Sequence, residues 1–236
     1  MLQVDLHQAG YTDTEVTIRD IGFSIAKGEM AALIGANGAG KSTTIKAILG
    51  LLPYVKGRIS FLEESAPYAY VPEQPTYYDY LTLWEHIELL AAARGFAYGS
   101  WEQRAEELLH IFRMTDSKHH YLSKFSKGMK QKAMLIFAFL AKPDFYIVDE
   151  PFIGLDPTAV RDFLILLHKE RERGAGVLLC THVLDTAEKI CERFLVISDG
   201  TLLADGNLET IRDICQMPDG SLMDCFDAIV RKERYE

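Results

Sequence analysis

The fold is decided by the stretch Gly35-Ala36-Asn37-Gly38-Ala39-Gly40-Lys41-Ser42-Thr43. An apolar run from Met30 to Ile34 precedes it and predicts a buried strand, while Ser42 to Leu52 predicts a helix. A strand, a glycine-rich turn, a Lys-Ser pair and a helix, in this order, are the context of a phosphate-binding loop. The stretch therefore predicts a protein that binds a nucleotide through its phosphates.

The chemistry of the loop follows from its residue types. Glycines let successive backbone N–H groups turn inward and form a nest for an anion, and a helix N-terminus adds partial positive charge there. Lys41 is long enough to reach the β- and γ-phosphates, and the Ser42 hydroxyl is an oxygen ligand suited to Mg²⁺. We expect ATP and Mg²⁺ to bind here, with the backbone from Asn37 to Thr43 holding the phosphates.

Length and composition limit the possible classes of protein. The chain has 236 residues, 48% of them hydrophobic, and a net charge of -9, which argues against broad nucleic-acid binding because that requires a basic face. Met1 to Gly10 does not look like a signal peptide, and the most apolar run, Ala133 to Ala141, is too short to span a bilayer. Four cysteines without metal-ligand spacing favour reduced thiols in the cytosol.

The first third of the chain is rich in strand patterns. We expect strands over Leu2–Leu6, Val16–Ile25, Gly57–Leu62 and Tyr68–Pro72. The phosphate-loop helix is expected to stop at Leu52-Pro53. Gln74 then lies just beyond the end of a strand.

The middle of the chain, Leu81 to Ala141, predicts a helical insert. Thr82 with Glu85, and Ser100 with Gln103, have the spacing of capping boxes, so a helix is expected to start at each. The second of these helices is expected to run to about Met114. A last, mostly buried helix is expected to start near Ser126 and to end before Lys142-Pro143.

After the insert, strand and helix patterns alternate. The expected elements are strands at Phe145–Val148, Val177–Thr181 and Phe194–Ser198, helices at Thr158–Arg173 and Leu184–Cys191, a hairpin turn at Asp199-Gly200, and two final helices capped by Asn207 and Ser221. Repeated βα units with apolar strands predict a parallel sheet covered on both faces. Ligands of such sheets bind at the carboxyl ends of strands, where the phosphate loop, Gln74, Asp149 and His182 fall.

A second chemical cluster follows the strand that begins at Phe145. Asp149 is placed to hold Mg²⁺ directly or through water, because this ion takes few carboxylates and keeps several waters. Glu150, the next residue, points elsewhere and is suited to polarising an attacking water, a role worth roughly 10²–10⁴ in rate. An ordinary solvated acid pair is the alternative interpretation, which the upstream phosphate loop disfavours.

With both motifs in place, nearly the whole chain resembles the nucleotide-binding subunit of ATP-binding-cassette (ABC) transporters. The motifs that carry the resemblance, in chain order, are Tyr11 as the adenine-stacking aromatic, the phosphate loop, Gln74, the signature Ser126-Lys127-Gly128-Met129-Lys130-Gln131, the acidic strand, Gly154-Leu155-Asp156 and the switch histidine His182. A surface aromatic without function is the alternative for Tyr11, and a satisfied strand-end histidine is the alternative for His182.

The signature departs from the family's commonest form, Leu-Ser-Gly-Gly-Gln. Phe125, Lys127 and Met129 replace its first Leu, first Gly and Gln, whereas Ser126 and Gly128 are kept. This version, together with the ending from Ser221 to Phe226, resembles the export-type branch and, within it, Ecs-type bacterial ATPases. The short link between Gly57 and Tyr68 indicates a trimmed antiparallel subdomain.

The resemblance implies an α/β fold of the phosphate-loop NTPase (RecA-like) kind. Its parallel-sheet core would carry an N-terminal antiparallel β subdomain and an inserted helical subdomain. Residues 1–80 and 142–206 would form the catalytic core with the β subdomain, 81–141 the helical subdomain and 207–236 a C-terminal helical extension.

The resemblance also implies roles for individual residues. Glu150 would activate water, His182 would contact the γ-phosphate, and Gln74 would approach Mg²⁺ beside Ser42 and Asp149. Two copies would close head to tail, so that Ser126 and Gly128 of one meet the nucleotide bound by the other. The nucleotide-contacting set is Tyr11, Gly35, Asn37, Gly38, Ala39, Gly40, Lys41, Ser42, Thr43, Ser126 and Gly128.

The implied partners are a second copy of the ATPase and a membrane permease that docks near Gln74 and the helical subdomain. The protein would then be cytoplasmic and peripheral on the inner face of the cell membrane. The exposed tyrosines between Pro75 and Leu83 suit a groove for a partner helix, although a local core for the insert explains them equally well. A soluble ATPase acting on ribosomes or DNA is the competing function; its usual second cassette or coiled coil is not evident in this sequence.

Overall fold

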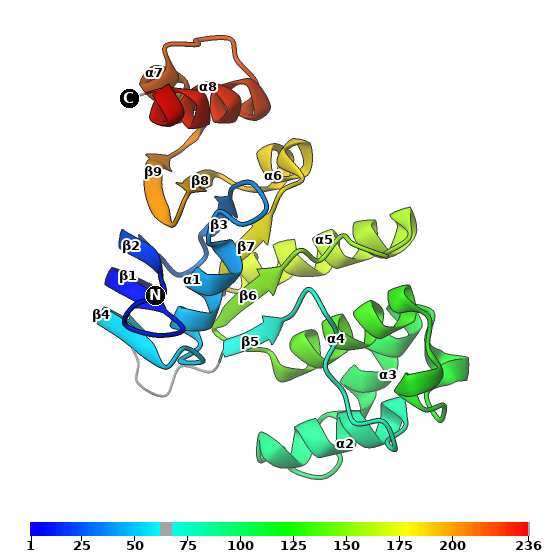
Figure 1. Cartoon of the computed structure of the whole chain (residues 1–236). Coiled ribbons are helices and arrows are strands. Elements are labelled where there is room, and N and C mark those ends of the chain that lie inside the picture. Colours follow the sequence, from blue (N-terminus) through cyan, green and yellow to red (C-terminus); the bar gives the residue numbers. More distant parts are fainter. Residues whose placement is uncertain (62–67, 236) are drawn as a thin grey trace. The chain divides into compact units, whose positions relative to one another are not determined.

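The computed structural model describes residues 1–61 and 68–235, and the chain divides into two compact units. One unit contains residues 1–66 and 176–236, and the other contains residues 67–175. Leu62 and the rest of the link to Tyr68, for which we expected a strand end and a trimmed subdomain, lie outside the described residues. Figure 1 labels the helices and strands of both units.

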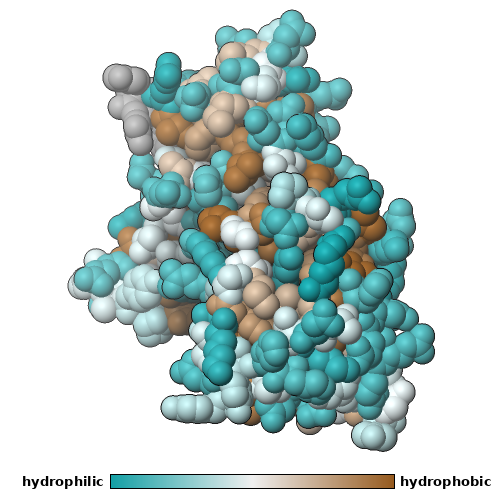
Figure 2. All heavy atoms as spheres, turned by 90° about the vertical axis from the view of Figure 1, so that its right-hand side faces the viewer, coloured by the Kyte–Doolittle hydropathy of each residue, from teal (hydrophilic) through white to brown (hydrophobic). Residues whose placement is uncertain are grey.

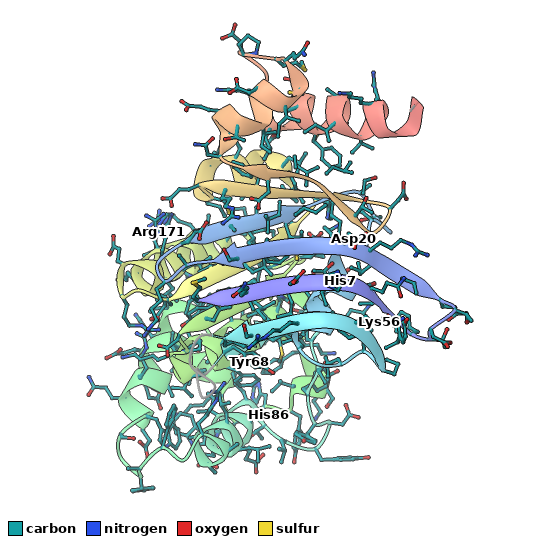
Figure 3. The ribbon with its side chains drawn as sticks, turned by 90° about the vertical axis from the view of Figure 1, so that its left-hand side faces the viewer. His7, Asp20, Lys56, Tyr68, His86 and Arg171 are labelled. Atoms are coloured by element: carbon teal, nitrogen blue, oxygen red, sulfur yellow. The ribbon has the colours of Figure 1, made fainter. Side chains whose placement is uncertain are left out.

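An antiparallel sheet forms the N-terminal part of the first unit. Its strands are β1 (Leu2–Gly10), β2 (Val16–Ile25) and β4 (Tyr54–Phe61), in the order β2-β1-β4. Alternating burial along β1 shows that one face of the sheet is packed and the other solvated. Figure 3 shows His7, Asp20 and Lys56 on the three neighbouring strands, and all three side chains are exposed.

The same unit holds a second sheet, in which β3 (Met30–Ile34) lies between two parallel neighbours. These are β7 (Gly176–Thr181) and β8 (Arg193–Ser198), and β9 (Thr201–Gly206) adds to β8 antiparallel. Every residue of β3 and β7 is buried, which explains why both strands are almost entirely apolar; Thr181, the last residue of β7, is the polar exception. The expected Asp199-Gly200 hairpin is confirmed, with φ of 42° and 80° at its two turn residues.

The described residues of the first unit also form the helices α1 (Lys41–Ile48), α6 (Leu184–Ile190), α7 (Leu208–Cys215) and α8 (Leu222–Tyr235). The cap at Asn207 is confirmed, because its side chain accepts a hydrogen bond from the Thr210 N–H at 2.9 Å. Helix α1 ends earlier than Leu52. Gly50, with φ of 69°, closes it through hydrogen bonds from the Gly50 and Leu51 N–H groups to the preceding turn.

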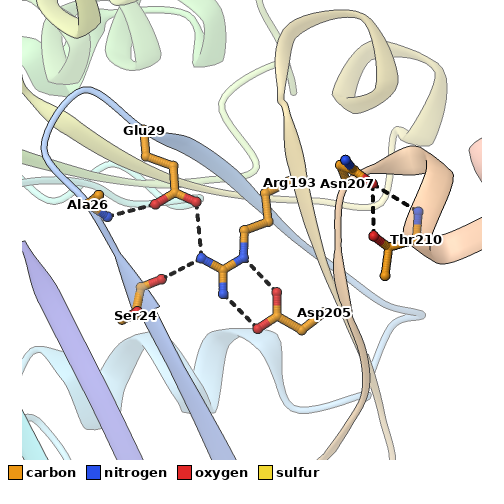
Figure 4. A network of polar contacts seen from close by, with 7 residues as sticks. All are labelled: Ser24, Ala26, Glu29, Arg193, Asp205, Asn207 and Thr210. Carbon is orange, nitrogen blue, oxygen red and sulfur yellow. Dashed lines mark hydrogen bonds and ion pairs between the residues drawn. The ribbon is translucent and has the colours of Figure 1, made fainter.

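A partly buried ion-pair network, drawn in Figure 4, ties β8 and β9 to the turn before β3. Arg193 donates to both carboxylate oxygens of Asp205, at 2.6 and 2.7 Å, and to Glu29 at 3.0 Å. The pKa of Arg193 is raised, mainly by the hydrogen bonds to Asp205. This bidentate pair fixes the register of the β8–β9 hairpin beside the parallel strands.

Within residues 68–175, the second unit contains two parallel strands, β5 (Tyr68–Val71) and β6 (Phe145–Asp149), and four α-helices with two short 3₁₀ turns. The α-helices are α2 (Leu83–Ala93), α3 (Glu102–Ile111), α4 (Lys127–Ala141) and α5 (Pro157–Glu172), and the 3₁₀ turns are η1 (Thr115–Ser117) and η2 (Leu122–Lys124). The helical insert is thus present where the sequence predicted it.

The two predicted capping boxes had different outcomes. Thr82 and Glu85 form a reciprocal box at the start of α2. The box predicted at Ser100 is wrong, because the Ser100 hydroxyl donates to the Ala97 carbonyl at 2.6 Å and α3 begins one residue later than a Ser100 cap would place it, at Glu102. Serine side chains bond to nearby carbonyls as readily as they cap helices, which is why spacing alone failed here.

In the part of the chain that the structure describes, no helix is long and apolar enough to cross a membrane. On the face drawn in Figure 2, hydrophilic side chains predominate, and hydrophobic ones lie in small groups between them.

Candidate nucleotide site

The phosphate loop joins β3 to α1 within the first unit, as the sequence predicted. Gly38 and Gly40 have φ of 85° and 105°, a conformation that residues with a Cβ rarely adopt. Gly40 is also the N-cap residue of α1, so the loop runs directly into the helix N-terminus. A nest of backbone N–H groups at a helix N-terminus fits a polyphosphate.

Lys41 is the first residue of α1 and is almost completely buried. Its Nζ donates hydrogen bonds to the carbonyls of Gly35 at 2.8 Å and Ala36 at 3.2 Å. The ammonium group is therefore held against the loop itself, where a phosphate bound by the loop would lie within its reach. Ser42, the next residue, is exposed.

His182 belongs to the same unit and the same edge of the sheet. β7 pairs in parallel with β3, and Ile34 lies opposite Thr181. Gly35 and His182 therefore follow directly after paired residues of neighbouring strands. The carboxyl ends of parallel strands are where α/β sheets bind ligands, so His182 lies at an edge of the sheet where a ligand is expected.

Tyr11 lies in the loop after β1 and is about half exposed, at 48%. Lys46 of α1 donates a hydrogen bond to the Tyr11 hydroxyl at 2.8 Å, and its Nζ lies 5.4 Å from the ring centroid. The phosphate-loop helix thus holds the aromatic ring in place. Lys46 was not among the residues predicted from the sequence. The pattern that could have found it is a cation five residues after Lys41 on the same helix.

The second unit carries the other set of predicted site residues. Asp149 ends β6, Glu150 follows it, and both are buried. Glu150 has φ of 47°, unusual for a residue with a side chain and typical of positions held strained for a function. Val71 of β5 pairs with Val148 of β6, so exposed Gln74 follows the strand beside the acidic one.

The signature residues form the N-terminus of α4. Ser126 is the N-cap residue, its hydroxyl accepts a hydrogen bond from the Met129 N–H at 3.3 Å, and it is exposed. Gly128 contacts the loop that follows Glu150: a Cβ built on Gly128 would lie 2.4 Å from the Gly154 carbonyl oxygen. Glycine at this signature position is therefore required by the protein's own packing.

Asp156, the last residue of the Gly154-Leu155-Asp156 motif, has two partners within its own unit. It caps α5 by accepting from the Ala159 N–H at 2.9 Å, and it pairs with Lys132 at 2.7 Å. These partners, chiefly Lys132, lower the pKa of Asp156 to about 2. Lys132 was not among the predicted residues, although its position one helical turn after Gly128 was a usable signal.

The donor set suits the expected magnesium ion. The Ser42 hydroxyl and the Asp149 carboxylate are hard oxygen ligands, and Mg²⁺ needs only one or two of them beside phosphate oxygens and water. Among the residues that the structure describes, no group of three His, Cys, Asp or Glu side chains forms a self-contained metal cage. Each of these two oxygen groups, taken by itself, is of a type that suits a cation arriving with the nucleotide.

A groove follows Gln74 in the second unit. It has a volume of about 620 Å³ and is lined by Tyr77, Tyr78, Asp79, Tyr80, Leu81 and Leu89. His86 of α2 holds its wall: the Tyr78 N–H donates to Nε2 at 2.9 Å, and Nδ1 lies 2.8 Å from the Thr82 carbonyl oxygen. Tyr80 and Tyr78 are 90% and 64% exposed, so much of this aromatic surface is open to a partner.

A phosphate-binding loop, an acid pair at a strand end and a histidine after a neighbouring strand define a nucleotide-hydrolysing protein of the α/β class. Known proteins that the chain resembles identify a narrower class. Residues 18–153 match the family model described as ABC transporter. The chain belongs to the ATP-binding proteins of ABC transporters and is an ATPase by class.

Two relatives from Bacillus subtilis match nearly end to end. The chain is 49% identical to an uncharacterized ABC transporter ATP-binding protein, YthP, over 99% of this chain and 98% of the relative. It is 40% identical to the ABC-type transporter ATP-binding protein EcsA, with the same coverage.

Solved structures agree with this assignment. An ATP-binding subunit of an ABC transporter matches with a TM-score of 0.92 and 40% identity, over 98% of this chain and 99% of that one. The ATP-binding cassette MJ0796, in a dimeric post-hydrolysis state with ADP and Pi, matches with a TM-score of 0.77 and 23% identity, over 88% and 99% of the two chains. At 23% identity, the similarity to MJ0796 supports the fold alone.

Proposed function

We propose that this protein hydrolyses ATP as the motor subunit of an ABC exporter whose membrane-spanning part is a separate chain. The observation that carries the proposal is the signature at the start of α4: Ser126 caps the helix yet remains exposed, so it is available to another molecule. The names of the two Bacillus relatives support the transporter assignment.

In the proposed cycle, two copies close head to tail around ATP. Lys41 and the nest from Asn37 to Thr43 hold the phosphates of one nucleotide, and Ser126 and Gly128 of the second copy cover its γ-phosphate. A single shallow site leaves part of the triphosphate charge uncompensated, so a second helix N-terminus both stabilises it and excludes water. Mg²⁺ held near Ser42, Asp149 and Gln74 would supply further charge neutralisation.

Hydrolysis is proposed to proceed by attack of a water on the γ-phosphate. Glu150 takes a proton from the attacking water, and His182 contacts the γ-phosphate and keeps the water in register. Tyr11 stacks on adenine with its position set by Lys46. Loss of the γ-phosphate removes the contacts that hold the two copies together, and the pair opens.

The tyrosine-lined groove after Gln74 is proposed as the docking site of the permease. Its exposed aromatic side chains suit a short helix with apolar anchors. Docking here would place the ATPase on the inner face of the cell membrane. Export as the direction of transport is supported by the Ser126–Gln131 signature and by the C-terminal helices α7 and α8.

The function is tested by purifying the tagged protein from detergent-solubilised membranes. We expect a multi-span membrane protein to co-purify, and its amount to fall when Tyr78 and Tyr80 are both changed to Ala. Recovery with ribosomes and without any membrane protein would instead support a soluble ATPase.

A further inference from the structure

In the second unit, the start of α4 is joined at two points to the loop that leads into α5. The first point is a contact between backbones. The Cα of Gly128 faces the Gly154 carbonyl so closely that a Cβ would approach the oxygen to 2.4 Å. Gly154 has φ of 85°, and a Cβ on it would lie 3.4 Å from the Cγ of Lys127. The signature helix thus rests directly on the loop between Glu150 and α5.

The second point is an ion pair. Lys132 Nζ lies 2.7 Å from Asp156 Oδ2, while Asp156 Oδ1 accepts the Ala159 N–H at 2.9 Å. The two oxygens of the carboxylate therefore act separately, since one joins the loop to α4 and the other begins α5. The side chain of Lys132 is only 13% exposed, so the pair is partly shielded from solvent on the lysine side.

The two points lie on one face of α4, because Gly128 and Lys132 are one helical turn apart. They meet the loop at Gly154 and Asp156, two residues apart. A helix that contacts a loop at one point is able to rotate about that point. Contacts at two points also fix the angle between the helix and the loop. Removing the ion pair therefore leaves the contact between Gly128 and Gly154 but allows α4 to rotate relative to the loop.

We propose that Lys132 is a positioning residue, which makes the signature turn and the loop from Glu150 to Asp156 move as one body. This rests on the proposed function, in which Ser126 and Gly128 receive the nucleotide of a second copy. When the second copy closes onto the signature of the first copy, it moves the Glu150 of that first copy into place. Lys132 touches neither nucleotide nor water in this scheme.

The test measures ATP hydrolysis by the full-length protein against ATP concentration, for Lys132→Met and Lys132→Arg. We expect Lys132→Met to lower kcat about tenfold, because coupling residues outside the binding sites carry effects of this order. Nucleotide affinity of the separate protomer should stay within about twofold, since the ion pair is remote from Lys41 in sequence and belongs to the other unit. Lys132→Arg, which keeps the ion pair, should restore most of kcat.

Arg113→Met is the matched control. It removes another ion pair to α5, from Arg113 Nη1 to Asp162 Oδ2 at 2.8 Å, which does not involve the loop. If Lys132→Met and Arg113→Met lower kcat equally, or Lys132→Arg fails to restore it, the positioning role is overturned. If Lys132→Met does not fold, Asp156→Asn replaces it, because Asn keeps the cap and loses the full charge of the pair.

The outcome separates this proposal from the function on which it rests. A wild-type protein that neither hydrolyses ATP nor dimerises with it refutes the motor function, and the positioning role with it. A wild-type protein that does both, beside a Lys132→Met variant with unchanged kcat, refutes only the role of Lys132.

Discussion

At the scale of single residues, the acid pair at the end of β6 shows how backbone position distinguishes two similar side chains. Asp149 ends the strand with ordinary extended geometry, whereas Glu150 turns away with φ of 47°. A positive φ re-aims the side chain relative to the strand, and such strain is retained at functional sites. The geometry in this way distinguishes the two carboxylates, for which different roles are proposed: binding of the cation for Asp149 and activation of water for Glu150.

We predict that Glu150→Gln keeps ATP binding and lowers turnover by about 10²–10⁴, because a glutamine accepts no proton. The amide is nearly isosteric, so the fold should be unaffected. Steady-state phosphate release and equilibrium binding of a fluorescent ATP analogue measure the two quantities. Normal turnover in this variant would remove Glu150 from the mechanism.

We predict that Gly128→Ala destabilises the protein by about 1–3 kcal/mol, the usual cost of forcing extra atoms into a packed contact. The added Cβ would meet the Gly154 carbonyl oxygen at 2.4 Å, so the loop has to move. Urea unfolding measures the change. Gly22→Ala is the control, because a Cβ there has its nearest neighbour at 4.0 Å and should cost far less.

At the scale of elements, helix α2 is held to the tyrosine groove by one buried imidazole. His86 stacks on Phe137, with ring centroids 5.8 Å apart, and accepts the Tyr78 N–H through Nε2. Accepting at Nε2 requires the neutral ring with its proton on Nδ1, which then donates to the Thr82 carbonyl. Both nitrogens are thereby used, and the groove wall is tied to the start of the helix.

We predict that His86→Ala lowers the free energy of unfolding by about 1–3 kcal/mol, because it leaves the Tyr78 N–H without its acceptor. Urea unfolding gives the total effect, and amide hydrogen exchange locates it. Faster exchange should be confined to the segment around Tyr78 and Thr82. Unchanged protection of the Tyr78 amide would contradict this account of the groove wall.

The start of α5 gives a pH dependence. The pKa of Asp156 is lowered to about 2 by Lys132 and by the Ala159 N–H, against 3.8 for the free side chain. A lowered folded-state pKa means that the stabilisation is complete above about pH 4 and is lost as the pH falls towards 2. The effect is expected to be only a few tenths of a kcal/mol, because Asp156 is half exposed and solvent screens the pair.

Asp156→Asn isolates this charge, since asparagine caps helices about as well as aspartate. We expect the urea midpoint of the wild type to exceed that of the variant above pH 4, and the difference to shrink as the pH is lowered to 2.5. A difference that is constant with pH would assign the effect to the cap and not to the ion pair.

At the scale of the whole molecule, predicted site residues lie in each of the two units of the chain, and the signature is proposed to act in a second copy. We predict that Lys41→Ala and Ser126→Arg proteins, each inactive alone, regain activity when mixed. Each mixed dimer would contain one site with both residues intact, so about a quarter of wild-type turnover is expected at equal amounts, if sites act independently. Phosphate release across mixing ratios measures it, and no recovery at any ratio would argue against a shared site.

Local patterns determined much of this protein. Glycines before Lys41, the apolar β3, and the caps at Thr82, Ser126 and Asn207 were all predictable, because each depends on backbone geometry or hydrogen bonds a few residues away. The chemistry expected of Lys41 likewise follows from its place at the start of a helix, and that of Asp149 and Glu150 from their place at a strand end. Two local signals failed: the Ser100 hydroxyl found another nearby partner, and α1 ends before Leu52.

Tertiary structure decided what depends on residues distant in sequence. Nothing near Gly128 shows that it presses on Gly154, nor that Lys132 reaches Asp156 or that Lys46 holds Tyr11. These contacts join segments 24 to 35 residues apart, and only the packing of complete helices and loops brings them together. Short-range sequence patterns identify the chemical groups, whereas long-range packing determines which of these groups are in contact.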